Sequence, residues 1–504
     1  MKYQVTEPYR AYLYISHVEF FHEKLSSLLV SKELSHLDYR SVIKYLCETL
    51  DQVYLPDFAV SFDNWLSSQP ASQSDRYLCY FKDNHGLWRK NILKQNAFIE
   101  RLATHICEST LANLTLFMDR FQNEKELLQN TFGLPVKYST GAIEIMGGDR
   151  HENGQQPVLL TLGEARIIYK PRDSQIENVL NDICAIAGIA PVCPKTLSRK
   201  THIWQNYVDN RPLQSLANAS DVYKRYGTIL SLVDLFNIND CHFDNFIVDE
   251  EHVYFIDPET SFQYFFEDTP AFERSIFQSG LLQSPEVVMN GIGHTSAITA
   301  ATNIFQSYTY PHALNDASED IQVRYEHGFA KRTHNYPHYE GKPVLSAQYI
   351  DDVIAGYKDG YARLRTYSVE LIARLEINDN IKPRYLIRTT AYYMLVINKI
   401  IHPDTSREFN KKFNPLIERF LHYDGAHPRF SELIPYEAFC LSNFDVPIFY
   451  TGLNTTSLFS EYHGEITDFF PCAPIEQIRL NFYRQPDYLN RQCELIARSM
   501  NVHA

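Results

Sequence analysis

The sequence predicts an α+β protein, because two long helical regions enclose a middle part that contains short strands. Apolar residues recur at three- and four-residue spacing before residue 135 and after residue 348, as in amphipathic helices. Between these regions, two pairs of short apolar runs are joined by turn residues, as in β-hairpins. The 504 residues suffice for roughly three domains or one large domain with insertions. We expect three regions, 1–135, 136–215 and 216–504.

The composition excludes several classes of protein. Hydrophobic residues make up 44% and charged residues 21% of the chain, as in an ordinary globular protein. The net charge of −14 argues against a nucleic-acid partner. Apolar runs are too short for a membrane span and the N-terminus has no signal pattern, so we expect a cytoplasmic protein. The nine cysteines form no CxxC pair, which excludes a zinc ribbon and disfavours a disulfide framework.

The first region is expected to be a packed helical platform without catalytic residues. Helical spacing of apolar residues is clearest in SVIKYLCETLDQVYL (41–55) and in FIERLATHICESTLANLTLFMDRF (98–121). The polar stretch SSQPASQSD (67–75) between them predicts a loop.

A β-hairpin is predicted for PVLLTLGEARIIYKPRD (157–173), and Lys170 ends its second strand. A lysine at this place can bridge nucleotide phosphates when a helix carboxylate fixes it. Glu177, on the helix predicted next, is the candidate partner. An exposed lysine at a strand end is the alternative interpretation.

The segment NDCHFDNFIVDEEHVYFIDPET (239–260) carries the pattern that most directly indicates chemistry. Asp240 and Asn245 are five positions apart, and Asp257 follows two predicted strands and their turn. Kinases use this order for phosphoryl transfer: the first carboxylate receives the hydroxyl proton, and the amide and second carboxylate hold Mg²⁺. The alternative is an acidic turn that caps the strands.

Two further groups could act on a phosphate. Arg384, Arg388 and Thr390 are predicted on one helix, with both arginines on the same face, where they could hold a phosphate. A salt-bridged surface is the alternative. In GGDRHENG (147–154), Asp149 and His151 lie on one side of an extended segment, and the histidine could transfer a proton. A turn with a capping aspartate is the alternative.

Together these motifs resemble the dehydratase domain of the class II lanthipeptide synthetases, the LanM family. The similarity runs from about residue 80 to 450, in family order. The similar stretches are GGDRH (147–151), IIYKPR (167–172), IWQNYV (203–208), NDCHFDNFIV (239–248), FIDPET (255–260), RYLIRTTAYY (384–393) and YEAFCLSNFDVPIF (436–449).

The resemblance implies a kinase-like, lipid-kinase-related core of two lobes, with an N-terminal helical platform and helical insertions. The lobes would be 136–215 and 216–504. Such enzymes use ATP and Mg²⁺ to phosphorylate Ser and Thr in a ribosomally made precursor peptide. They then eliminate phosphate, with ADP retained, to give dehydroalanine or dehydrobutyrine.

The resemblance also implies a role for each motif residue. Lys170 would bind nucleotide phosphates, and Asp257 would be the principal metal ligand, together with Asn245. Asp240 and His242 would complete the catalytic loop. Asp149 and His151 would be the family's GDxH pair, and Arg384 and Thr390 would take part in phosphate elimination. Arg388 is a further phosphate-binding candidate, and His151 is the best candidate by residue type for the base.

Two departures from the family pattern affect the prediction. ENGQQP (152–157) stands where the family has paired glycines and an arginine, and no cysteine has the setting of a zinc cyclase ligand. We therefore expect no zinc, either a stand-alone dehydratase or an excised domain, and a separate cyclase or tailoring enzyme as a possible partner. Two alternatives stay open: a peptide kinase that does not eliminate, and a non-catalytic kinase-like protein that binds the leader peptide.

Overall fold

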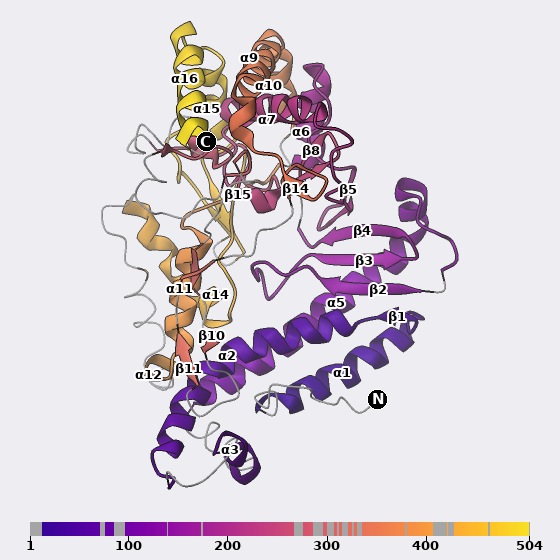
Figure 1. The fold of residues 1–504 in the computed structure, drawn as a ribbon, viewed down its shortest axis with the longest axis vertical. Coiled ribbons are helices and arrows are strands. Elements are labelled where there is room, and N and C mark those ends of the chain that lie inside the picture. The colour runs from indigo at the N-terminus through magenta and orange to yellow at the C-terminus, as the bar shows by residue number, and fades with distance from the viewer. Residues whose placement is uncertain are drawn as a thin grey trace. The chain divides into compact units, whose positions relative to one another are not determined.

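The fold is described from a computed structural model (Figure 1). It describes residues 13–502 apart from 71–75, 85–95, 139, 173–174, 267–275, 286–295, 300–306, 310–311, 315–320, 325–326, 330–334, 379–380, 407–420, 422–427 and 462–463. Part of the predicted loop 67–75 lies outside these residues. Within them the protein is mixed α+β, as predicted, and no helix combines the length and apolar character that a bilayer crossing needs.

The chain folds into two compact units. Unit 1 comprises Met1–Pro171, Tyr308–Gly328 and Ile387–Pro447, and unit 2 comprises Arg172–Ser307, Phe329–Leu386 and Ile448–Ala504. Each unit is therefore built from segments that are far apart in sequence. The three predicted regions and the kinase-like two-lobe arrangement stay predictions.

Unit 1 begins with the helices of the predicted platform. They are α1 (Ile15–Ser31), α2 (Arg40–Leu66), α3 (Arg76–Asn84) and α5 (Ala97–Phe132). Their apolar faces are buried, as Leu46 on α2 and Phe117 on α5 illustrate, because the helical spacing puts these side chains on one side. Helix α5 ends at Gly133, whose φ of 69° is a conformation that glycine adopts without steric cost.

Unit 1 also contains the predicted hairpin. Strands β1 (Leu37–Asp38), β2 (Gly141–Ile145), β3 (Val158–Leu162) and β4 (Ala165–Lys170) are neighbours in that order. The β3–β4 pair is antiparallel, with Val158 opposite Tyr169. Helix α5 runs along this sheet (Figure 1). The ring centres of Phe117 on α5 and Tyr169 on β4 are 5.3 Å apart. The later elements of unit 1 are β10 (His312–Leu314), β11 (Gln322–Arg324), α11 (Thr390–Ile401), α12 (Pro403–Ser406) and α14 (Ile434–Ser442).

Unit 2 contains the hydrophobic core that is described below. Its helices are α6 (Ile176–Ile186), α7 (Asn218–Leu235), α9 (Ile350–Thr366), α10 (Ser368–Glu376), α15 (Pro474–Asn481) and α16 (Pro486–Val502). Its strands include β5 (Thr196–Ser198), β6 (Ile203–Asn206), β7 (Phe246–Asp249), β8 (His252–Phe255), β15 (Arg384–Tyr385), β16 (Phe449–Thr451), β17 (Leu458–Ser460) and β18 (Gly464–Ile466). The predicted β7–β8 hairpin and the predicted helix at α6 are confirmed.

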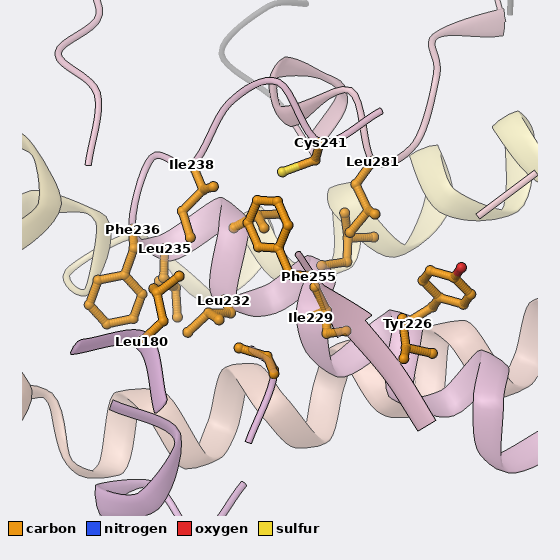
Figure 2. Packing of buried hydrophobic residues seen from close by; sticks show 14 of the residues in the cluster. Leu180, Tyr226, Ile229, Leu232, Leu235, Phe236, Ile238, Cys241, Phe255 and Leu281 are labelled. Carbon is orange, nitrogen blue, oxygen red and sulfur yellow. The ribbon is translucent and has the colours of Figure 1, made fainter. Parts of the chain in front are cut away.

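The core of unit 2 positions the loop that follows α7. Tyr226, Ile229 and Phe236 point into one apolar cluster that also contains Phe255 from β8 (Figure 2). Helices α7 and α9 pack closely because both carry glycine at the contact: a Cβ at Gly227 would lie 2.0 Å from a backbone oxygen of α9. The loop after α7 therefore starts from a rigid support.

The prediction that Arg384 and Arg388 lie on one helix is wrong. Arg384 lies in strand β15, which pairs antiparallel with β16, and α11 begins only at Thr390. Thr389 is the N-cap, and its side chain accepts a hydrogen bond from the backbone N–H of Tyr392. Arg384 and Arg388 consequently share no helix face.

Candidate functional site

Five charged side chains of unit 2 form what we call the arginine–carboxylate cluster: Arg172, Glu177, Asp257, Glu259 and Arg384. Arg172 is its centre. Its guanidinium lies 3.0 Å from Glu177 Oε1 and 2.5 Å from Asp257 Oδ1, and its Nε lies 3.6 Å from Glu259 Oε2. One side chain thus joins helix α6 to the segment that follows β8.

Glu259 connects this centre to Arg384. Its Oε1 accepts a hydrogen bond of 2.7 Å from Arg384 Nη1, and its backbone oxygen accepts one of 2.7 Å from the N–H of Arg384. Gln263 donates to the Arg384 carbonyl at 2.8 Å. Arg384 is 7% exposed, so its position is fixed by contacts on both backbone and side chain.

The exposure of the cluster is uneven. The side chain of Glu177 is fully buried, whereas Asp257 keeps 35% of its side-chain surface exposed. A ligand from solution can therefore reach Asp257, while Glu177 holds Arg172 from the protein interior. Burial alone would lower the pKa of Arg172, but the neighbouring carboxylates of Glu177, Asp257 and Glu259 raise it, so the guanidinium stays charged.

The predicted catalytic loop lies beside this cluster. Asn245 Nδ2 donates to the backbone oxygen of Asp240 at 2.7 Å, and the backbone oxygen of Asn245 accepts from the N–H of Ile256 at 2.8 Å. These two bonds tie Asp240 and Asn245 to the residue that precedes Asp257. Because Asn245 Nδ2 donates to Asp240, the side-chain oxygen of Asn245 is not part of this hydrogen bond.

Asp240 has an unusual backbone and an unusual carboxyl group. Its φ is +57°, a left-handed conformation that aspartate tolerates better than most residues. Burial raises the pKa of Asp240 to about 6, with opposing effects from His242 and Arg384 and a further rise from the carboxylates of Glu259 and Asp257. Such a carboxyl group can exchange a proton near neutral pH.

His242 faces the same carboxylate. Its Nδ1 accepts a hydrogen bond from the N–H of Asp244 at 3.3 Å, so in the neutral ring the hydrogen resides on Nε2. Nε2 lies 3.7 Å from Asp240 Oδ1, which is beyond a direct hydrogen bond. The two side chains are therefore close enough for an ionic attraction only when the ring is protonated.

Three of the predicted site residues, Lys170, Asp149 and His151, lie in unit 1. Lys170 ends β4 and is 6% exposed. Asp149 and His151 follow Gly147 and Gly148, both with positive φ, and His151 opens a turn that closes at Gln155. His151 is partly buried, and its Nδ1 lies 2.8 Å from the backbone oxygen of Val446.

The remaining predicted residues, Arg388 and Thr390, belong to unit 1 as well. Arg388 forms an ion pair of 3.0 Å with the fully buried Glu437, and its guanidinium lies 4.8 Å from the ring centre of Tyr392. These contacts match the salt-bridged alternative for Arg388. Thr390 is the first residue of α11, directly after the capping Thr389.

The structure adds Arg172 and Glu259 to the predicted residues of unit 2. Both lie inside motifs already singled out: Arg172 is two positions after Lys170, and Glu259 is two positions after Asp257. The spacing of charged residues within these motifs was the available signal. Glu177, the predicted partner of Lys170, binds Arg172, and the Lys170–Glu177 pair stays a prediction.

The cluster has the donor chemistry of a magnesium site. Within the described parts of the chain, no group of three His, Cys, Asp or Glu residues is arranged to hold a metal by itself. Mg²⁺ commonly uses only one or two protein oxygens and completes its shell with water and phosphate oxygens. The cluster contains two arginines and three carboxylates, and Asp240 beside it adds a fourth carboxylate. When all four are ionised, these side chains together carry a charge of 2 − 4 = −2. The exposed carboxylate of Asp257 and the amide oxygen of Asn245 therefore fit this ion.

Comparisons with known proteins agree with the motifs. Residues 97–452 match the family model described as a domain of unknown function, DUF4135. The chain is also 23% identical over 308 residues to the lacticin 481/lactococcin biosynthesis protein LcnDR2 of Lactococcus lactis subsp. lactis. This similarity covers 56% of the chain and 33% of that relative. The predicted resemblance to the LanM dehydratase domain is thereby confirmed, and the chain belongs to the DUF4135 family.

Proposed function

We propose that the protein is a lanthipeptide-type dehydratase that phosphorylates Ser and Thr residues of a ribosomal precursor peptide and then eliminates the phosphate. The observation that carries the proposal is the arginine–carboxylate cluster beside the loop of Asp240 and Asn245. The role in lanthipeptide biosynthesis is supported by the resemblance to LcnDR2, whose name assigns it to the biosynthesis of lacticin 481 and lactococcin.

In the first half-reaction, the substrate hydroxyl attacks the γ-phosphorus of ATP and ADP leaves. Asp240 receives the hydroxyl proton, a role supported by its raised pKa of about 6 and its partly exposed carboxylate. Lys170 binds the nucleotide phosphates. Asn245 and Asp257 would hold Mg²⁺, and the bound ion would neutralise negative charge on the phosphoryl group.

In the second half-reaction, a base removes the Cα proton, the Cβ–O bond breaks, and inorganic phosphate leaves with the former side-chain oxygen. Arg384 binds the departing phosphate, because a guanidinium pairs well with a dianion. Thr390 and Asp149 contribute to the same step, and His151 is the proposed base. ADP stays bound while this step proceeds.

The test is an incubation of the purified protein with ATP, Mg²⁺ and the precursor peptide encoded beside its gene, followed by mass spectrometry. Loss of water from the peptide is the expected result. Gain of a phosphoryl group without loss of water would replace the proposal by a peptide kinase, and an unchanged peptide that still binds would indicate a leader-peptide-binding protein. An Asp404→Asn variant serves as the control for carboxylate changes, because this side chain is 87% exposed.

A further inference from the structure

The turn that contains His151 is held by residues nearly three hundred positions later in the chain, within unit 1. Asp445 Oδ1 lies 3.6 Å from Arg150 Nε, and Asp445 Oδ2 accepts a hydrogen bond of 3.1 Å from the N–H of Gly154. One carboxylate therefore contacts the residue before His151 and the residue three positions after it.

This contact is deeply buried. The side chains of Arg150 and Asp445 are each 5% exposed, and the guanidinium also donates to Ser109 Oγ at 2.8 Å and to Thr110 Oγ1 at 3.3 Å on α5. Water does not screen an ion pair at this depth as it does a surface pair. The position of Arg150 is thus set from two directions.

The next residue fixes the imidazole itself. The N–H of Val446 donates to the backbone oxygen of Arg150 at 2.7 Å, and the backbone oxygen of Val446 lies 2.8 Å from His151 Nδ1. A carbonyl oxygen only accepts hydrogen bonds, so Nδ1 carries the hydrogen. The lone pair of the neutral ring is therefore on Nε2.

We propose that Asp445 is a positioning residue that holds His151, through Arg150 and the Gly154 amide, with Nε2 as the atom that accepts a proton. The assignment of this proton to the elimination step rests on the proposed function, whereas the orientation and tautomer of His151 do not. Gly154 belongs to the segment 152–157, which departs from the family pattern.

Gly154 supports this interpretation independently. Its φ is +78°, and a Cβ at this position would lie 2.1 Å from Arg150 Nη2. A side chain at this position would therefore require the Arg150 guanidinium to move. The turn and the ion pair are therefore matched to each other.

The test compares Asp445→Asn with the double variant Arg150→Met/Asp445→Asn. The single variant leaves a buried arginine without its charge partner, which destabilises proteins strongly, whereas the double variant leaves no unpaired charge. Asn153→Gly is the control, because Asn153 is an exposed residue of the same turn with a φ of 68° that glycine adopts readily. Circular dichroism and thermal unfolding establish that each variant is folded.

The direct readout is the tautomer of His151, measured by NMR on protein with isotope-labelled histidine. The His151 signal is identified by its loss in His151→Gln. The proposal expects protonated Nδ1 in the wild type and in Asn153→Gly, and mixed tautomers in the two Asp445 variants. An unchanged tautomer in a folded Asp445 variant would overturn it, and so would a double variant that cannot fold.

The second readout is the rate of phosphate release from a synthetic phosphorylated peptide with ADP and Mg²⁺. Misplacement of a proton acceptor by about 1 Å can cost about 10²-fold in rate, so we expect a loss of this size in both Asp445 variants. A wild-type protein that releases no phosphate would contradict the proposed function, while the NMR result would still decide the role of Asp445. Unchanged phosphate release with a changed tautomer would remove His151 from the elimination step.

Discussion

The two units surround their arginines differently. In unit 1, Arg150 is paired with Asp445 and Arg388 with Glu437, and these carboxylates are almost completely buried. In unit 2, Arg172 faces three carboxylates, one of which keeps about a third of its surface exposed. The first arrangement holds chain segments in place, whereas the second leaves the carboxylate of Asp257 partly open to solvent. Similar residue types are thus enclosed in one unit, and in the other they form the cluster that we propose binds Mg²⁺.

The largest effect is expected for the exposed carboxylate of the cluster. Asp257→Asn should reduce phosphorylation by about 10³-fold and abolish dehydration, because an oxygen ligand and its charge are lost where the phosphoryl group is transferred. Transfer of label from γ-labelled ATP to the peptide measures the first step. Asp404→Asn should behave as the wild type, and near-normal transfer by Asp257→Asn would refute the assignment of the cluster.

A selective effect is expected for Arg384 and Thr390. Arg384→Met or Thr390→Ala should slow elimination by about 10²–10³-fold, so that phosphorylated peptide accumulates. A mass-spectrometric time course follows both products. Arg374→Met is the matched control, since Arg374 pairs with Asp182 at a partly exposed site of the same unit. If peptide stayed unphosphorylated in both variants, these residues would belong to the kinase step or to folding.

A change of Arg388 tests whether this arginine stabilises the fold or binds phosphate. Arg388→Met leaves the buried Glu437 without its ion pair, and we expect a loss of about 3–5 kcal/mol in the free energy of unfolding. Denaturant unfolding measures it. Arg40→Met, which breaks the exposed pair with Asp38, should cost only about 0–1 kcal/mol. Equal losses of unfolding free energy in the two variants would contradict a structural role for the buried Arg388–Glu437 pair.

The smallest effect concerns pH. The folded-state pKa of Asp240, about 6, lies above the ordinary value of 3.8, so the fold favours the neutral carboxyl. The contribution of the neutral Asp240 carboxyl to the free energy of unfolding is fully present below about pH 4 and is lost as the pH rises through about 6. Asp240→Asn should therefore raise the Tm relative to the wild type at pH 8 and change it little at pH 4. An equal difference at both pH values would show that the pKa is not raised.

The elements of the fold that depend on local pattern could be predicted from sequence. The hairpins of β3–β4 and β7–β8 and the helices α5, α6 and α7 follow from apolar spacing and turn residues close together in the chain. Strand β15 could not be predicted in this way. It is two residues long, and it pairs with β16, which lies more than sixty positions later.

The site shows the same limit. Asp240, Asn245 and Asp257 could be found because they occur in one short segment with a known spacing. The contact between Arg172 and Asp257 was missed because the two residues are 85 positions apart, and Asp445 was missed because it contacts a turn 291 positions earlier. Long-range ion pairs of this kind follow from the tertiary fold, which the spacing of residues in one sequence does not reveal.

The central claim is that dehydration proceeds through a phosphorylated side chain. The most direct test uses a precursor peptide whose serine hydroxyl carries heavy oxygen, incubated with ATP, Mg²⁺ and the wild-type protein. Breaking the Cβ–O bond after phosphorylation transfers the side-chain oxygen to the leaving phosphate. Mass spectrometry should find one heavy oxygen in one inorganic phosphate for every dehydrated residue. Unlabelled phosphate, or a peptide that loses its heavy oxygen without phosphate release, would contradict this route.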